Sequence, residues 1–148
     1  MGSFPTGVTI VASRDSDGVP FGLTVNSFTS LSLEPPLILV CVGHSSTSHD
    51  RLIAGSHFSV NFLSAEQVDV ASRFAREPSA GRFDDVEWRG TPSGCPVLDG
   101  VTAALDCAVH EVLQGGDHTI LVGRVEGSWL NDRPAMVFHR GRFSSTDG

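Results

Sequence analysis

The residues best suited to chemistry form a run of small polar side chains between Thr24 and Ser32. Six of these nine positions carry a hydroxyl or an amide, namely Thr24, Asn26, Ser27, Thr29, Ser30 and Ser32. A buried hydroxyl needs a hydrogen-bond partner, so a fully buried strand would not accumulate them. The run therefore predicts either an edge strand with one wet face or a strand end that binds a polar ligand.

A second polar cluster, Gly-His-Ser-Ser-Thr-Ser at residues 43–48, directly precedes a predicted short helix. Backbone N–H groups at a helix start, with hydroxyls beside them, favour an anion. N-capping by Ser48 explains one hydroxyl but not the others. Arg82 and Phe83 add a guanidinium and an aromatic edge, although ordinary surface packing produces the same pair. Together the clusters predict a ligand with a phosphate and a flat polar ring, which describes a redox cofactor.

Patterns for other chemistries are absent from the sequence. It has no GxSxG, HExxH or CxxC motif and no lysine, which excludes a P-loop, a Schiff-base enzyme and a lysine general base. His44 and His49 are five residues apart, which does not place them on one helix face. The acidic cluster of Asp84, Asp85 and Glu87 has the character of a solvated charge run. We therefore expect no metal site.

Composition bounds the remaining classes. The chain has 148 residues, 40% of them hydrophobic, which suffices for one domain over residues 1–148. A formal charge of −7 argues against nucleic acid or an anionic membrane as a partner. No apolar run could span a bilayer, and no signal-peptide pattern is present. Three widely spaced cysteines (Cys41, Cys95, Cys107) indicate reduced thiols and a cytoplasmic protein.

Short strands must position the polar clusters. The expected strands, all apolar or alternating runs, cover residues 8–12, 19–25, 37–42, 58–63, 101–113, 119–130 and 135–140. Pro35 and Pro36 end the segment that carries the first polar cluster. A helix is expected near residues 48–54, and another from the Ser64/Gln67 capping box to Pro78. Residues 77–100 predict a long surface loop. About seven strands with mostly hairpin connections predict a mainly β fold, a small antiparallel barrel with a few short helices.

Three ordered motifs resemble the flavin reductase family. They are residues 4–11 (FPTGVTIV), residues 22–37 (GLTVNSFTSLSLEPPL) and residues 116–125 (GDHTILVGRV). Members of this family are small reductase components of two-component flavin-dependent monooxygenases and have the FMN-binding split-barrel fold. The resemblance implies a homodimer that binds FMN or FAD and reduces it with NADH or NADPH. Reduced flavin would then diffuse to a separate monooxygenase.

The resemblance also implies roles for individual residues. The isoalloxazine would be bordered by Thr24, Asn26, Ser27, Phe28, Cys41 and Val42. The ribityl chain and phosphate would lie near Thr29, Ser30, Ser32, Ser45 and Ser48. The pocket would be closed or shaped by Arg82, Phe83, Arg140 and Phe143. For Cys41 a small buried hydrophobe, and for Arg140 an exposed strand end, are the ordinary alternatives.

His118 matches the histidine of the family's Gly-Asp-His motif, which lies beside the nicotinamide. The resemblance implies that His118 orients the nicotinamide or donates to its carboxamide, whereas the residues alone favour a turn histidine. Hydride transfer requires no proton from this residue. The chain departs from the family in one respect, since only residues 1–3 precede the first motif where members carry a helical segment.

Three other hypotheses fit the same residues. A split-barrel protein could retain its flavin and reduce a different acceptor, or it could bind flavin without being an enzyme. A structural barrel whose hydroxyls face water would need no ligand. The main hypothesis is an NAD(P)H-dependent flavin reductase.

Overall fold

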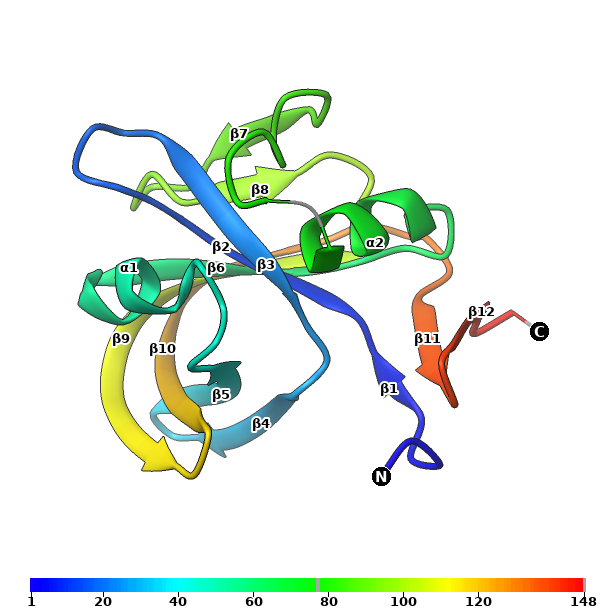
Figure 1. Ribbon diagram of the computed structural model, residues 1–148, viewed down its shortest axis with the longest axis horizontal. Coiled ribbons are helices and arrows are strands. Elements are labelled where there is room, and N and C mark those ends of the chain that lie inside the picture. The colour runs from blue at the N-terminus through cyan, green and yellow to red at the C-terminus, as the bar shows by residue number, and fades with distance from the viewer. Residues whose placement is uncertain (77, 148) are drawn as a thin grey trace.

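The computed structural model describes residues 1–76 and 78–147. Its main sheet contains β2 (Thr9–Arg14), β3 (Pro20–Val25), β4 (Phe28–Leu33), β5 (Pro36–Gly43), β6 (His57–Phe62), β9 (Ala103–Gly115) and β10 (His118–Leu130). These strands run antiparallel in the order β3-β2-β6-β9-β10-β5-β4. The edge strands β3 and β4 are joined by residues 26–27, and the sheet curls so that they converge (Figure 1). The predicted mainly β split barrel is confirmed.

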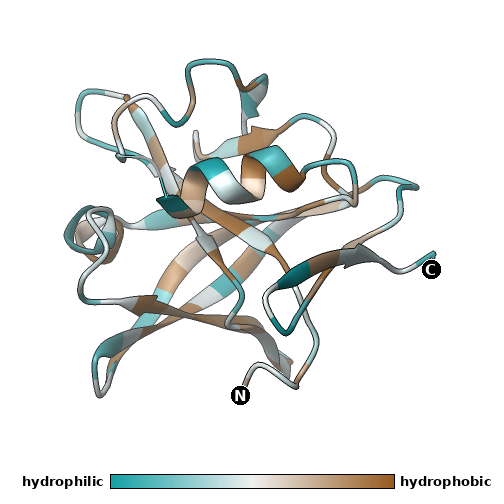
Figure 2. Ribbon diagram, turned by 45° about the vertical axis from the view of Figure 1, so that its right-hand side comes forward, coloured by the Kyte–Doolittle hydropathy of each residue, from teal (hydrophilic) through white to brown (hydrophobic). Residues whose placement is uncertain are grey.

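Two smaller sheets and two helices surround this barrel. The first small sheet has the order β1 (Thr6–Gly7), β11 (Met136–His139), β12 (Arg142–Ser145). The second pairs β7 (Trp88–Gly90) with β8 (Pro96–Leu98). The helices are α1 (His49–Ala54) and α2 (Val68–Arg76), and α2 lies across the main sheet (Figure 2). Within residues 1–76 and 78–147, no helix has the length and apolar character needed to cross a membrane.

Both faces of the central strands are buried. On β2, Val11 belongs to the core inside the barrel, whereas Ile10 and Ala12 belong to a second core beneath α2. Because successive side chains of a strand point to opposite faces, burial on both sides requires the unbroken apolar sequence of this strand. The second core also contains Phe74 of α2, so packing against the sheet fixes the position of this helix.

The predicted end signals of the two helices are confirmed only in part, because Ser48 precedes α1 without a side-chain cap hydrogen bond and α2 begins at Val68, four residues after Ser64. The backbone N–H of Ser64 donates to Gln67 Oε1 at 2.9 Å, which is one half of the expected capping box. Helix α2 then buries Ala71 and Phe74 against the sheet. Helix α1 is followed by Gly55, whose N–H donates to the carbonyl of Leu52.

The expectation of a surface loop over residues 77–100 is wrong for its second half. Residues 88–98 form the β7–β8 hairpin, and Cys95, Val97 and Leu98 are buried. Local signals missed these strands because each is three residues long and prolines and glycines interrupt them. The structure has more strands than the seven expected, and most of the additional strands are short, namely β1, β7, β8 and β12.

Candidate functional site

The main cleft lies where the end of β3 meets the end of α2. It has a volume of about 670 Å³ and is lined by Leu23, Thr24, Gly43, Ser45, Ser46, Thr47, Phe74, Ala75, Arg76, Pro78 and Arg82. An adjoining hollow of about 310 Å³ shares Thr24, Ala75 and Arg76 with the cleft and adds Asn26, Phe138 and Phe143. A third hollow shares Asn26 and includes Phe28. The first polar cluster thus supplies residues to three neighbouring spaces.

Residues 43–48, which we call the hydroxyl loop, form one wall of the cleft. The Ser46 N–H donates to the carbonyl of Gly43, and the Ser48 N–H donates to Ser46 Oγ at 3.2 Å. These bonds turn the backbone tightly between β5 and α1 and leave Ser45 and Thr47 exposed along the cleft. A turn of this composition can offer several hydroxyls to one ligand.

Three of the predicted site hydroxyls outside β4 already have partners in the protein. Thr24 Oγ1 donates to the carbonyl of Ala71 at 2.7 Å, which ties β3 to α2. Ser27 Oγ donates to the carbonyl of Cys41 at 2.9 Å, which ties the β3–β4 connection to β5. Ser48 is fully buried, and its Oγ lies 3.3 Å from Ser79 Oγ. Of these three side chains, Thr24 lines the cleft, whereas Ser27 and Ser48 do not.

Apart from Phe28, the predicted residues on β4 and β5 lie outside the three spaces. Thr29 and Ser30 are exposed on β4, where Thr29 Oγ1 donates to the carbonyl of Ser30, and Ser32 is half-buried. On β5, Cys41 is half-buried, whereas Val42 is completely buried in the barrel core. None of these five residues lines the cleft or the two hollows beside it.

Arg82 and Phe83 point to different surroundings. Arg82 is only 7% exposed, lines the cleft and donates from Nη1 to the carbonyl of Gly22 at 2.7 Å. Phe83 packs edge-on against Phe74, with ring centroids 4.9 Å apart, and belongs to the second core. The pair therefore divides between the cleft wall and the support behind it.

His118 lies at the tip of the β9–β10 hairpin, close to the start of the hydroxyl loop. It pairs with Gly43 across β10 and β5, and a methyl group at Gly43 would lie 3.6 Å from His118 Nε2. His118 Nδ1 lies 2.7 Å from Asp117 Oδ1. The hydrogen bond and the charge of His118 lower the pKa of Asp117. Because the carboxylate only accepts, the bonded Nδ1 carries the proton and Nε2 is the ring's free acceptor in the neutral form.

The C-terminal residues of the predicted site lie at the adjoining hollow or near it. Phe143 lines that hollow, and its ring centroid is 5.3 Å from that of Phe138. Arg140 is exposed in the β11–β12 turn, where φ is +50° and its N–H donates to the carbonyl of Gly2. Arg140 does not line the hollow, although its neighbour Gly141 does.

Sequence reasoning missed Arg76, which lines both the cleft and the adjoining hollow. As the last residue of α2 it also complements the negative end of the helix dipole, which is an ordinary reason for an arginine there. Ser46 and Thr47 were part of the recognised polar cluster but were not selected individually. Only the packing of α2 on the sheet brings Arg76 opposite the hydroxyl loop.

The cleft suits a phosphate-bearing ligand with a flat ring. Hydroxyls and a guanidinium lie along the main cleft, and these are groups that hold phosphate oxygens. The adjoining hollow has aromatic walls, Phe138 and Phe143, which suit a planar ring. The donor set therefore fits a flavin nucleotide. Among the described residues, no group of three or more histidine, cysteine or acidic side chains could hold a metal ion.

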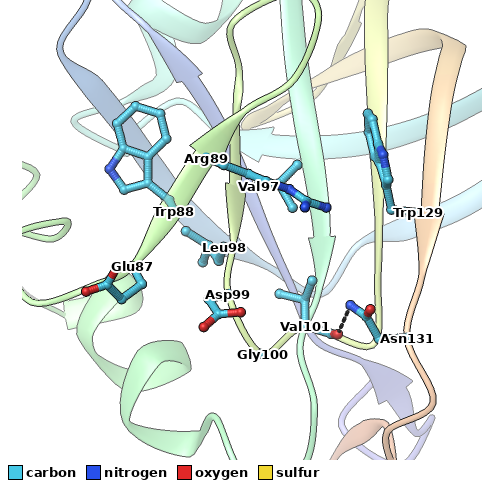
Figure 3. A pocket seen from close by; sticks show the side chains of 10 residues that line it. All are labelled: Glu87, Trp88, Arg89, Val97, Leu98, Asp99, Gly100, Val101, Trp129 and Asn131. Carbon is cyan, nitrogen blue, oxygen red and sulfur yellow. Dashed lines mark hydrogen bonds between the residues drawn. The ribbon is translucent and has the colours of Figure 1, made fainter.

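A separate hollow of about 280 Å³ lies beneath the β7–β8 hairpin (Figure 3). Trp88 and Trp129 stand on opposite sides of it, and Glu87, Arg89 and Asp99 bring charges of both signs. It shares no residue with the cleft, and no predicted site residue lines it. We therefore take the cleft as the candidate functional site.

Comparison with known proteins supplies the family. The flavin reductase like domain matches residues 1–147. The chain is 47% identical over 142 residues to the stachydrine N-demethylase reductase subunit of Rhizobium meliloti, covering 96% of this chain and 61% of that protein. It is 46% identical over 147 residues to an NADH-dependent FAD reductase of Streptomyces globisporus, covering 96% and 80%. The chain thus spans less than two thirds of the first relative's length.

A solved structure agrees with these relatives. The NADH:FAD oxidoreductase of Streptomyces globisporus C-1027, in complex with NAD and FAD fragments, superposes with a TM-score of 0.91. Its sequence identity is 45%, and the match covers 97% of this chain and 86% of that one. The curled sheet, the hydroxyl-lined cleft and the Gly-Asp-His hairpin therefore occur in a chain that belongs to the flavin reductase like domain family.

Proposed function

We propose that residues 1–148 form a single NAD(P)H-dependent flavin reductase domain that reduces FMN or FAD and supplies reduced flavin to a separate monooxygenase. The observation that carries this proposal is the cleft, where the hydroxyl loop and Arg76 lie close to the His118 hairpin. The relatives support it, because one is named an NADH-dependent FAD reductase and another a reductase subunit.

Binding and orientation are the tasks of this chain's residues. Ser45, Thr47 and Arg76 would hold the flavin phosphate, while Phe138 and Phe143 would pack along the ring. Thr24, bonded to the carbonyl of Ala71, would keep the wall between the two spaces in place. Fixing two reactants in the correct geometry removes most of the entropic cost of a bimolecular reaction.

A bound flavin supplies the hydride acceptor and the nicotinamide nucleotide supplies the hydride. His118 would orient the nicotinamide, because Asp117 holds its Nδ1 and leaves Nε2 beside Gly43. Hydride transfer from the nicotinamide to the flavin requires no proton from the protein, so His118 needs no change of protonation in that step. Ser30, Ser32 and Arg140 remain candidates for contacts with the outer parts of the nucleotides.

A homodimer is part of the proposal. Leu33, at 93% exposure, and Leu31 project from β4, which is an edge strand of the main sheet. Val112 and Leu113 are exposed on the β9–β10 hairpin, which β5 separates from β4 in the sheet. Exposed apolar residues on an open sheet edge are typical of a contact surface. The free thiols of Cys41, Cys95 and Cys107 agree with a cytoplasmic location.

The test is a steady-state assay of NADH and NADPH oxidation with FMN, FAD and riboflavin added in turn. We expect turnover that saturates with added flavin, and the preferred pair of nucleotides follows from the same data. Tight flavin binding without turnover would refute the reductase and favour a flavin-binding module. No binding and no turnover would refute a flavin function altogether. Analytical ultracentrifugation of the protein and of Leu33→Asp tests the dimer, since the variant should dissociate.

A further inference from the structure

We propose that His49 is a positioning residue that holds the hydroxyl loop in register with the His118 hairpin and so sets the affinity for the flavin phosphate. The inference rests on the proposed function, because it concerns the flavin that this cleft would bind. His49 itself lines neither the cleft nor the adjoining hollow. His49 acts through the hydroxyl loop, which directly precedes it in the chain.

Both ring nitrogens of His49 are engaged. Nδ1 lies 2.8 Å from Asp50 Oδ1, and Nε2 lies 2.7 Å from Thr119 Oγ1. A carboxylate can only accept, so Nδ1 carries the proton and Nε2 of the neutral ring accepts the hydroxyl proton of Thr119. The side chain of His49 is 14% exposed and that of Thr119 is buried. The Thr119–His49 bond is therefore sheltered from competition with water.

This bond fixes the far end of the hydroxyl loop to the same hairpin that fixes its near end. Gly43, the first loop residue, pairs with His118, and the His44 N–H donates to the carbonyl of Asp117 at 3.0 Å. His49, which directly follows the loop, is bonded to Thr119. Two consecutive residues of β10 thus anchor both ends of a six-residue loop. The exposed hydroxyls of Ser45 and Thr47 lie between these anchors.

The two anchors differ in kind. The near end is held by backbone pairing, which no side-chain substitution removes. The far end is held by side-chain contacts, which are the His49–Thr119 bond, the Ser48 Oγ–Ser79 Oγ contact at 3.3 Å and an edge-on contact between the His44 and His49 rings at 5.1 Å. Among these contacts, the His49–Thr119 bond is the one that joins the far end to β10, so loss of the Thr119 hydroxyl releases this end from the His118 hairpin while the barrel stays intact. The hydroxyls that would hold a phosphate then lose their common orientation.

The test compares FMN with riboflavin, which has the same ring and side chain but no phosphate. Both dissociation constants are measured by quenching of flavin fluorescence in the unaltered protein and in Thr119→Val, which removes the hydroxyl at nearly constant volume. We expect FMN to bind about fivefold more weakly to this variant, the usual effect of one lost hydrogen bond, and riboflavin to bind equally well. The matched control Thr119→Ser keeps the hydroxyl and should retain the affinity for FMN.

The ratio of the two dissociation constants separates positioning from a general loss of structure. Partial unfolding lowers the apparent affinity for both flavins by one common factor, whereas displacement of the loop lowers only that for FMN. His49→Ala should reproduce Thr119→Val, and the double variant should be no weaker than either single one. His49→Gln should recover part of the affinity, because its side-chain oxygen can accept the Thr119 proton.

Equal weakening of FMN and riboflavin, or additive effects in the double variant, would overturn the inference. So would unchanged FMN binding in both single variants. If the unaltered protein binds neither flavin, the proposed function fails and this inference fails with it. If the unaltered protein prefers FMN and the variants keep that preference, only the role of His49 is refuted.

Discussion

The contribution of Arg76 to phosphate binding is the most direct test of the site, because no sequence signal pointed to this residue. Arg76→Gln removes the guanidinium that lines both the cleft and the adjoining hollow, and it keeps a side chain of similar length. A charge-assisted hydrogen bond to a phosphate contributes roughly 1.5–3 kcal/mol in a sheltered site. Arg76 is exposed, so solvent screening should reduce this to about 1 kcal/mol.

The expected result is a dissociation constant for FMN that rises about fivefold, with little change for riboflavin. Arg73→Gln is the matched control, since Arg73 lies on the same helix and lines neither the cleft nor the adjoining hollow. Both variants remove one positive charge from a chain of formal charge −7, so a long-range effect would be the same in each.

Flavin titrations at low and high salt complete the assay. The difference between the unaltered protein and Arg76→Gln should shrink at high salt, because exposed charges are screened over about 10 Å at 0.1 M salt. If Arg73→Gln weakens FMN binding as much as Arg76→Gln, the effect comes from net charge and the assignment is refuted. Equal weakening of riboflavin would refute a contact with the phosphate.

Three further predictions concern catalysis, packing and the thiols. His118→Ala should lower kcat for NADH-dependent flavin reduction about tenfold at unchanged FMN affinity, and equal loss of both would show that His118 is misplaced. Gly123→Ala should destabilise the protein by about 1–3 kcal/mol, because the new methyl would lie 2.5 Å from the Phe58 ring. A second change in the same protein, Phe58→Leu, should restore part of the melting temperature. If it restores none, the destabilisation does not come from this clash. Burial raises the pKa of Cys107 to about 12, so the half-buried Cys41 should react with a thiol reagent before Cys107, and simultaneous reaction of both would contradict this. The free energy of unfolding should also fall as pH rises from 9.0 towards 12, because the thiol of Cys107 ionises in this range only in the unfolded chain.

The sequence by itself determined the local elements. An unbroken apolar run at residues 37–42, consecutive prolines at 35 and 36 and the Ser64/Gln67 signal each act within a few residues. The structure has strand β5 over the first, a turn at residues 34–35 just before it, and helix α2 from Val68 onward, after the Ser64–Gln67 hydrogen bond. The turn before His118 is likewise set by its own glycines and joins the two longest strands. The family resemblance followed from the same local motifs, and with it the split-barrel fold, whereas the site residues that it implies stay a prediction.

The tertiary structure decided which hydroxyl groups already have a hydrogen-bond partner within the protein. Thr24 and Ser27 carry hydroxyls, as Ser45 and Thr47 do. The hydroxyl of Thr24 donates to the carbonyl of Ala71, and that of Ser27 donates to the carbonyl of Cys41. Those partners are 47 and 14 residues away, at distances where no local pattern operates.

The same reason explains the remaining differences. Arg76 faces the hydroxyl loop only because Phe74 packs α2 onto the second core, and residues 95–98 are buried only because β6 and its neighbours receive them. Local sequence specifies the turns and the alternation of buried and exposed side chains along each element, since these depend on neighbouring dihedral angles. Which side chains meet in the cleft depends on how distant elements pack, and that choice is made by the fold as a whole.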